Sequence, residues 1–441
     1  MNHKDLISAF FLCFGVAFAG QLTSDEQTIL AQAEASREAR MAWFKAARFG
    51  MFIHWGDYAV PARGEWVLDR ERIPIEEYTR YAAQFQPTAY NPDEWVSMAQ
   101  QAGMKYMVLT SRHHDGYCLW DTKTTDWNAV KTGPRRDLFK AYVEACRRKG
   151  MRVGFYYSIA DWRHPDWIRG MRLKDDAAMA RFGEYVRAQL RELLTRYGTI
   201  DILWFDGTSG RPERWNAASI MAMAWKINPD LIINNRSGLP GDWDTPEQEL
   251  GRPKTNRYWE SCFTLNDNWG YSRYDKNYKS VKTIISMIQH AVQYKGNVLL
   301  NVGPMADGRF PPESVAKLKE LAGWMRINGD AVLKAGPSPL QWSNYGNSTA
   351  GPSEIYLMVY YWPGQTLALA GLKNRILSAQ ILGSDRRITV EPQKTRVLLR
   401  GLPPEPPDPN CTVIKLVTDG TPAADYSYQG WPFELGGAGN R

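Results

Sequence analysis

One carboxylate at the end of an apolar run is the residue of this chain best placed to do chemistry. Residues 202–205 read Ile-Leu-Trp-Phe, which is typical of a strand buried on both faces. Asp206 ends the run, and Gly207 lets the backbone turn away. A charge at the rim of a buried strand is costly unless it is paired or used. Catalytic residues of α/β barrels gather at the carboxyl ends of the strands, so Asp206 is a candidate catalytic group, with capping of a following helix as the alternative.

Polar and aromatic residues also follow most of the other predicted strands. They are His54, His113, His114, Tyr156, Trp162, Arg236, Glu260 and Asn301. Their repetition predicts that one end of a barrel is lined with hydrogen-bonding groups and aromatic rings. Such a lining suits a polyhydroxylated ligand, because histidine and arginine donate to hydroxyls, carboxylates accept from them, and aromatic rings cover the apolar face of a sugar.

Cleavage of a glycoside requires two carboxyl groups, one as nucleophile or base and one as acid. Asp206 is the first candidate. Glu65 follows the first predicted strand, Glu247 lies in a turn-rich loop after the fifth, and Glu260 lies on the sixth. Spacing alone does not choose among these three for the second group.

Metal chemistry is not expected, although three of the six histidines lie at strand ends. His113 and His114 are adjacent, so on a strand they would point to opposite faces, and the chain has no HExxH motif. Cys118, Cys146, Cys262 and Cys411 are widely spaced and form no CxxC pair. We therefore expect neither a metal nor a cofactor, and no disulfide framework, although a single bridge stays open.

The elements that position these residues follow from the hydrophobic period, which switches repeatedly between strand and helix. Strands are predicted at residues 48–56, 106–110, 151–158, 201–207, 231–235, 257–262 and 296–302. Helices are predicted at residues 91–103, 137–150 and 182–197, the first two ending at glycine. This alternation predicts a parallel α/β barrel.

The pattern changes near Ala335. Residues 336–339, Gly-Pro-Ser-Pro, are typical of a linker. Short β-type runs follow at residues 355–361, 366–369, 387–390, 395–399 and 411–417. The 441 residues thus predict two domains, a barrel over residues 20–335 and a β-sandwich over residues 336–441.

The first 19 residues have the pattern of a secretory signal peptide. Lys4 supplies a positive charge, residues 6–19 are apolar, and Ala17-Phe18-Ala19 offers a cleavage site before Gly20. The apolar run is short for a membrane span. We therefore expect export to the periplasm or the extracellular space with no membrane span after cleavage, an uncleaved anchor being the alternative.

The charge of the chain gives no sign of a nucleic-acid partner. The net charge of +7 comes from 54 basic and 47 acidic residues spread along the chain, without a Lys/Arg-rich block. The oligomeric state does not follow from the sequence.

Six groups of residues occur in an order that resembles a known family. They are Trp43-Phe44, residues 48–56, residues 113–120, residues 203–207, Trp259-Glu260 with Trp269-Gly270-Tyr271, and residues 297–304. These groups resemble the motifs of the α-L-fucosidases of glycoside hydrolase family 29, and the resemblance extends from about Trp43 to Ala335.

The resemblance implies an irregular (β/α)8-like barrel of the TIM type, followed by an all-β sandwich, that works as a retaining exo-α-L-fucosidase on fucosylated oligosaccharides or glycoconjugates. It implies that Asp206 is the nucleophile. It also implies a set of residues that contact fucose, namely His54, Glu65, His113, His114, Tyr156, Trp204, Arg236 and Trp269. Trp269 is the candidate for packing against the C5 methyl group.

The acid/base is less clearly implied, because its position varies within the family. The Thr-Pro-Glu loop resembles one subgroup and favours Glu247, whereas other members have a glutamate near Glu260. The same loop and Trp269-Gly270-Tyr271 favour a subgroup that acts on α-1,3/1,4 branches. Two alternatives stay open, a retaining glycosidase for a related sugar such as an α-L-galactoside and an inactive fucose-binding protein.

Overall fold

The computed structural model describes residues 22–208, 211–250, 257–340 and 343–425. The predicted signal peptide, residues 1–19, lies outside the described residues. The chain divides into two compact units. The first comprises residues 1–100, 104–278 and 299–315, and the second comprises residues 101–103, 279–298 and 316–441. The predicted domain ranges, 20–335 and 336–441, stay a prediction.

A curved sheet of seven strands is the frame of the first unit. The strands are β1 (Phe49–Ile53), β2 (Tyr106–Arg112), β3 (Arg152–Ser158), β4 (Ile202–Asp206), β5 (Ile232–Ile233), β6 (Glu260–Thr264) and β7 (Asn297–Val302). Their order is β5-β4-β3-β2-β1-β7-β6, and the neighbours from β1 to β5 pair in parallel. The predicted parallel barrel is confirmed, although the described residues form seven strands rather than eight.

The gap between β5 and β6 is filled by residues 242–248, which we call the bridging segment. Parallel bridges join Asn234 to Trp243 on one side, and Asp244 to Trp259 and Glu247 to Cys262 on the other. The sequence predicts a loop here, because the turn-forming residues conceal the pairing. The bridging segment is instead tied to both neighbouring strands.

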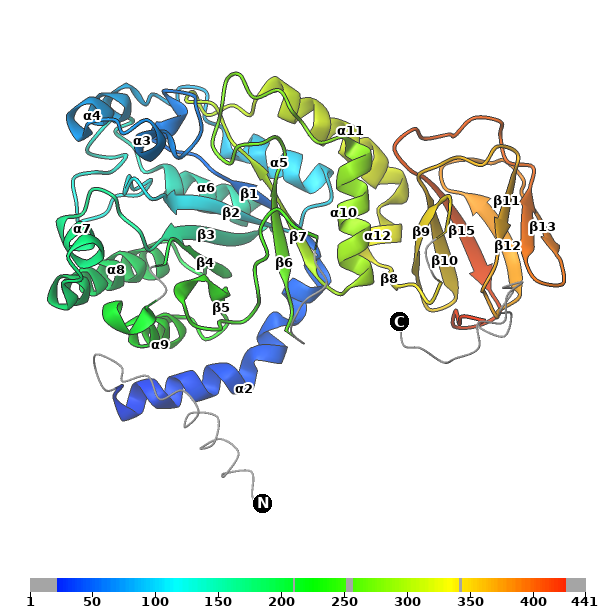
Figure 1. Cartoon of the computed structure of the whole chain (residues 1–441), viewed down its shortest axis with the longest axis horizontal. Coiled ribbons are helices and arrows are strands. Elements are labelled where there is room, and N and C mark those ends of the chain that lie inside the picture. Colours follow the sequence, from blue (N-terminus) through cyan, green and yellow to red (C-terminus); the bar gives the residue numbers. More distant parts are fainter. Residues whose placement is uncertain (1–21, 209–210, 251–256, 341–342, 426–441) are drawn as a thin grey trace, which may run out of the picture. The chain divides into compact units, whose positions relative to one another are not determined.

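Helices and short turns connect the strands of the first unit. They are α2 (Ser24–Ala47), η1 (Asp57–Ala59), α3 (Val67–Arg70), α4 (Ile75–Gln84), α5 (Pro92–Gln101), α6 (Leu138–Arg148), α7 (Pro165–Arg172), α8 (Asp176–Arg196), η2 (Pro212–Trp215), α9 (Ala217–Ile227) and η3 (Asn235–Ser237). The Asp137 carboxylate caps α6 by accepting from the Lys140 N–H at 2.8 Å, as its sequence predicts. In Figure 1, α8 and α9 lie side by side next to strands β4 and β5.

The barrel interior is packed with aromatic rings. Phe52 on β1, Tyr156 on β3 and Trp204 on β4 are at most 1 % exposed and contact one another. Trp243 of the bridging segment is also buried in this cluster. Side chains two residues apart on a strand point to the same face. The side chains two residues further along these strands, such as His54 and Asp206, therefore form the next layer at the carboxyl end, and this cluster supports them from below.

The second unit contains three helices and the C-terminal strands. The helices are α10 (Val281–Gln293), α11 (Pro312–Asn328) and α12 (Asp330–Leu333). One sheet has the order β12-β15-β10-β9-β8, formed by β8 (Gly336–Pro337), β9 (Gly346–Ala350), β10 (Glu354–Val359), β12 (Ile376–Ile381) and β15 (Thr412–Thr418). The other has the order β11-β14-β13, formed by β11 (Thr366–Leu369), β13 (Thr389–Pro392) and β14 (Val397–Arg400).

The two sheets enclose an aliphatic core that includes Ile355, Leu357, Leu399 and Ile414. The predicted all-β C-terminal region is confirmed, and the sequence missed β8, β9 and β12. None of the described helices combines the length and the apolar character needed to cross a bilayer.

Candidate active site

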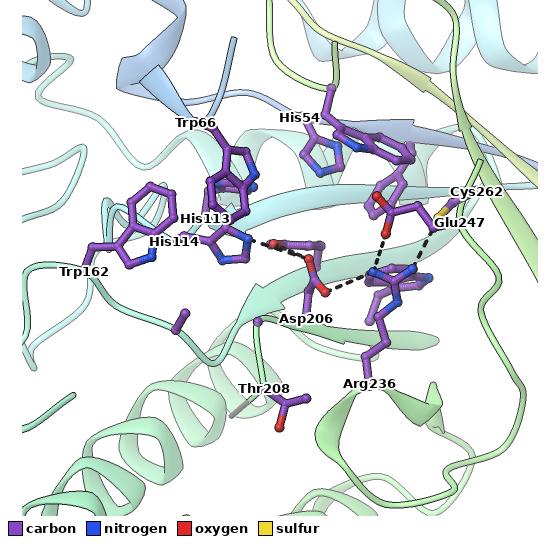
Figure 2. Close-up of a pocket in the computed structure, with 16 residues that line it drawn as sticks. His54, Trp66, His113, His114, Trp162, Asp206, Thr208, Arg236, Glu247 and Cys262 are labelled. Carbon is purple, nitrogen blue, oxygen red and sulfur yellow. Dashed lines mark hydrogen bonds and ion pairs between the residues drawn. The ribbon is translucent and has the colours of Figure 1, made fainter. Parts of the chain in front are cut away.

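A cavity of about 360 Å³ lies at the carboxyl end of the barrel strands (Figure 2). Nine of the predicted site residues line it, namely His54, His113, His114, Tyr156, Trp204, Asp206, Arg236, Glu247 and Trp269. The residue types and the strand-end positions therefore converge on one cavity, as the sequence predicts.

Asp206, the last residue of β4, lies at the centre of this cavity in Figure 2. Tyr156 Oη donates to its Oδ2 at 3.0 Å, and Arg236 Nη1 donates to its Oδ1 at 3.1 Å. Burial would raise the pKa of Asp206, but the opposing interactions, led by the charge of Arg236, outweigh burial, and the pKa lies below the usual value. Gly207 turns the chain away with φ of +70°, which a β-branched or bulky residue would adopt only under strain.

Arg236 connects Asp206 with Glu247. Its Nη1 lies 3.1 Å from Asp206 Oδ1 and 2.7 Å from Glu247 Oε2. Because both oxygens contact one nitrogen, the nearest oxygens of the two carboxylates lie within about 6 Å of each other, compared with about 5–5.5 Å between the carboxyl groups of retaining glycosidases. Arg236 is held in place by Thr245, which accepts from Nε at 2.9 Å, and its guanidinium lies 4.7 Å from the Trp204 ring centroid.

Glu247 reaches the cavity because its backbone belongs to the bridging segment. The Cys262 N–H donates to Pro246 O at 3.1 Å, and the Gln248 N–H donates to Cys262 O at 3.0 Å. These two bonds hold the backbone on both sides of Glu247 against β6. The Glu247 side chain is 41 % exposed, so it can exchange a proton with solvent.

The adjacent histidines His113 and His114 lie beyond the end of β2. The alternation that would send them to opposite faces applies only on a strand, and these two residues lie past its end. Both line the cavity, and their ring centroids are 4.1 Å apart.

The hydrogen bonds of two histidines leave an acceptor nitrogen in each. His54 Nδ1 donates to Asn301 Oδ1 at 2.8 Å, while Asn301 Nδ2 donates to Trp269 O at 2.7 Å. His114 Nδ1 lies 2.6 Å from Ser158 Oγ, which itself donates to Ala160 O. Burial lowers the pKa of His54 to about 3 and lowers the pKa of His114, so both rings are neutral near pH 7. Their Nε2 atoms are then acceptors suited to sugar hydroxyls.

Two predicted residues, Glu65 and Glu260, are buried and do not line the cavity. Glu65 Oε2 accepts from the Gly270 N–H at 2.7 Å. Burial raises the pKa of Glu65. Its contact with Gly270 places it beside Trp269, outside the layer of side chains that line the cavity.

Glu260 lies one layer below the cavity. Its carboxylate accepts from Tyr106 Oη at 2.5 Å and from Trp204 Nε1 at 3.0 Å. Burial raises the pKa of Glu260 to about 7, although the two hydrogen bonds act to lower it. Cys262, two residues further along β6, lines the cavity instead.

The sequence did not single out five further residues of the cavity wall, which are Phe52, Trp66, Ala160, Thr208 and Cys262, whereas Trp162, named among the strand-end residues, does line the cavity. Phe52 could have been found, because it lies two residues before His54 and so shares its face of β1. Trp66 and Ala160 come from the loops after β1 and β3, where only the tertiary fold decides which side chain faces the cavity.

The described residues contain no group of three or more histidine, cysteine, aspartate or glutamate side chains arranged to hold a metal ion. Cys118, Cys146, Cys262 and Cys411 are all buried and unpaired, so no disulfide joins any two of these four.

The comparison with known proteins agrees with this geometry. The family model described as alpha-L-fucosidase matches residues 17–330. The solved structure of alpha-L-fucosidase isoenzyme 1 from Paenibacillus thiaminolyticus has 38% sequence identity and a TM-score of 0.81, and the match covers 87% of this chain and 100% of that chain. Tissue alpha-L-fucosidase of Homo sapiens is 31% identical over 360 residues, which is 73% of this chain and 76% of the relative.

A second solved structure is a trapped covalent intermediate of a family 29 alpha-L-fucosidase from Bacteroides thetaiotaomicron, in complex with 2-fluoro-fucosyl fluoride. It has 30% sequence identity and a TM-score of 0.77, and the match covers 86% of this chain and 96% of that chain. Because the matched family model spans most of the chain, the chain belongs to the alpha-L-fucosidase family, glycoside hydrolase family 29.

Proposed function

We propose that the chain is a retaining exo-α-L-fucosidase that removes terminal α-L-fucose from fucosylated oligosaccharides or glycoconjugates and needs no cofactor. One observation carries the proposal: Asp206 and Glu247 contact the same nitrogen of Arg236. The resulting limit of about 6 Å between their nearest oxygens suits a retaining enzyme and is shorter than the roughly 6.5–9.5 Å that an inverting enzyme needs to hold a water.

In the first step, Asp206 attacks the anomeric carbon of the fucoside while Glu247 gives its proton to the leaving oxygen. The bond from the anomeric carbon to the leaving oxygen breaks, and an ester bond to Asp206 forms. The lowered pKa of Asp206 keeps this carboxylate ionised and ready to attack. The hydrogen bond from Tyr156 and the ion pair with Arg236 fix its direction.

In the second step, Glu247 acts as a base and removes a proton from water. The water oxygen bonds to the anomeric carbon, the ester to Asp206 breaks, and α-L-fucose leaves with its configuration retained. Glu247 is ion-paired with Arg236 in the structure, so the proposal requires it to leave this partner when the leaving oxygen arrives.

The cavity walls suit 6-deoxy sugars such as fucose. Phe52, Trp204 and Trp269 form an apolar wall, with Phe52 5.0 Å from Trp204 and 5.9 Å from Trp269 between ring centroids. We place the C5 methyl group against this wall. A C6 hydroxyl in the same position would lose its hydration without gaining a partner, which disfavours the α-L-galactoside alternative.

The test is Asp206→Gly with an aryl α-L-fucoside. Loss of the nucleophile should lower kcat by about 10³-fold or more. Added azide should restore part of the turnover and give a β-fucosyl azide, because the small anion attacks from the face that Asp206 left. Asp230→Gly, at an exposed position before β5, is the matched control.

Three outcomes would contradict the proposal. Unchanged turnover by Asp206→Gly would remove Asp206 from the mechanism. Fucose binding by the unaltered protein without any turnover would indicate the inactive sugar-binding protein. Faster turnover of the aryl α-L-galactoside than of the fucoside would reassign the sugar.

A further inference from the structure

A second, wider depression of about 580 Å³ adjoins the active-site cavity, and we call it the arginine groove. It is formed by the end of α3, the turn between α3 and α4, the loop after β3 and the end of α7. Arg70, Arg72, Arg172 and Trp162 line it. Trp162 also lines the active-site cavity, so the two depressions share a wall.

The arginines of the groove outnumber the carboxylates that line it. Arg70, Arg72 and Arg172 are exposed, and Asp69 is the one acidic side chain among the described residues of the lining. Within the described part of the chain, none of these three guanidinium groups forms an ion pair with a carboxylate.

Three acidic residues near the groove are already paired with other arginines. Glu71 is paired with Arg63, Asp166 with Arg181, and Asp175 with Arg169. The groove therefore has a positive charge that is available to an anion from solution.

Aromatic rings connect the arginine groove with Asp206. The ring centroids of Trp66 and Trp162 are 5.0 Å apart, and each lies 5.3 Å from that of His114, whose Nε2 is 3.8 Å from Asp206 Oδ2. Figure 2 shows His114, Trp66 and Trp162 on the side of Asp206 opposite Arg236 and Glu247. Trp66 is 36 % exposed and has the Arg70 guanidinium 5.0 Å from its ring centroid. Exposed indole rings beside a sugar site are surfaces on which further sugar rings can stack.

We propose that the arginine groove binds a part of the substrate beyond the reacting fucosyl ring and selects saccharides with anionic groups, either sulfate esters or carboxylates. The inference rests on the proposed function, because it takes the active-site cavity to hold fucose. Guanidinium groups bind planar or tetrahedral oxyanions through paired N–H donors, which a neutral saccharide does not match.

The experiment uses the full chain and three fucosylated oligosaccharides with one common backbone: a neutral form, a sulfated form and a form with a sialic or uronic carboxylate. The variant is Arg72→Gln/Arg172→Gln. Arg70 is left intact, because it contacts Trp66 of the active-site cavity. Arg191→Gln is the matched control, since Arg191 is exposed near the end of α8, outside the groove. A small aryl fucoside reports on the chemistry alone.

The unaltered protein should hydrolyse at least one anionic form with kcat/KM about tenfold above the neutral form at low salt. The double variant should lose this preference, mainly through KM, and keep its turnover of the aryl fucoside. The preference of the unaltered protein should also fall as ionic strength rises. The anionic form with the larger rise in kcat/KM over the neutral form shows whether sulfate or carboxylate is the recognised group.

Equal kcat/KM of the unaltered protein for the neutral and anionic forms would overturn the proposal. So would a preference for an anionic form that survives in the double variant, or one that Arg191→Gln lowers as much as the double variant does. A failure of the proposed function gives a different result, namely no turnover of the aryl fucoside by the unaltered protein. In that case, binding of the sulfated oligosaccharide by calorimetry, with and without the two arginines, still decides whether the groove selects anions.

Discussion

At the scale of single residues, the two candidate acids, Glu247 and Glu260, lie in adjacent layers of side chains in the barrel. Glu247 lies in the cavity beside Arg236, whereas Glu260 lies below the cavity floor between Tyr106 and Trp204. The pKa of Glu260 is raised by burial to about 7, which resembles the property of a general acid. Its position argues otherwise, because an acid must reach the leaving oxygen directly or through one water. We therefore assign Glu260 the role of holding Trp204, a wall of the cavity.

Replacement of each glutamate by glutamine separates the two roles. Glu247→Gln should lower kcat/KM by about 10²–10⁴-fold for a fucoside with a poor leaving group and much less for one with a good leaving group. Glu260→Gln should keep most of the activity on both, since the glutamine oxygen can accept from Trp204 while its amide donates to Tyr106 Oη. Aryl fucosides with leaving groups of high and low pKa provide the measurement. A leaving-group dependence seen in Glu260→Gln alone would make Glu260 the acid.

A second measurement on Glu260→Gln reports on its structural role. The pKa of Glu260 is about 7 in the folded protein against a usual value of 4.5, so the folded state holds this proton more tightly. The stability that the folded protein gains from holding this proton is complete below pH 4.5 and is lost as the pH rises to about 7. The free energy of unfolding of the unaltered protein, relative to Glu260→Gln, should therefore fall by about 3 kcal/mol between pH 4.5 and pH 8.

At the scale of elements, the bridging segment is what brings Glu247 to the active site. Its first residue, Asp242, is 5 % exposed and is paired with Arg40 of α2 at 2.5 Å. The other oxygen of Asp242 accepts from the Ile233 N–H on β5 at 2.7 Å. One carboxylate thus ties α2, β5 and the bridging segment together.

Asp242→Ala should destabilise the protein by about 3–5 kcal/mol, because it leaves the Arg40 guanidinium buried without its partner. It should also lower kcat/KM, since the bridging segment loses the contact that fixes its start. Thermal unfolding and turnover of an aryl fucoside measure the two effects. Asp242→Asn is the matched control, which keeps an oxygen for the Ile233 N–H and should lose less. Equal stability of Asp242→Ala and the unaltered protein would show that the pair does not hold the segment.

The sequence is sufficient to predict the barrel strands and the position of Asp206 at the end of one of them, because both depend on local patterns. A charge that ends an apolar run is visible without a structure, and β3, β4 and β7 lie within the predicted ranges. The choice between Glu247 and Glu260 is not local. It depends on the register of the bridging segment against β6, where Glu247 pairs with Cys262 and Glu260 falls one layer lower. Turn-forming residues also hide the pairing of this segment, so its role appears only in the tertiary structure.

At the scale of the whole molecule, the second compact unit joins three helices of the predicted barrel region to the β-sandwich. Trp324 Nε1 on α11 donates to Cys411 O at 2.8 Å, and both residues are buried. Gln293 at the end of α10 exchanges two hydrogen bonds with the Ser338 backbone, at 3.1 and 2.9 Å. The boundary predicted at residues 335/336 would cut these bonds and expose the helix faces that the sandwich covers within this unit.

We therefore expect that residues 20–335 do not fold alone. The shortened chain should aggregate or unfold without a cooperative transition, because α10 and α11 would present buried apolar and polar groups to water. Circular dichroism during heating, with turnover of an aryl fucoside, is the measurement. Trp324→Phe in the full chain is the control: it removes one hydrogen bond, should cost about 1 kcal/mol and should leave a cooperative, active protein. If the shortened chain unfolds cooperatively and hydrolyses the fucoside, the expectation is wrong. Residues 335/336 would then be a true domain boundary, and the barrel would fold and act without the sandwich.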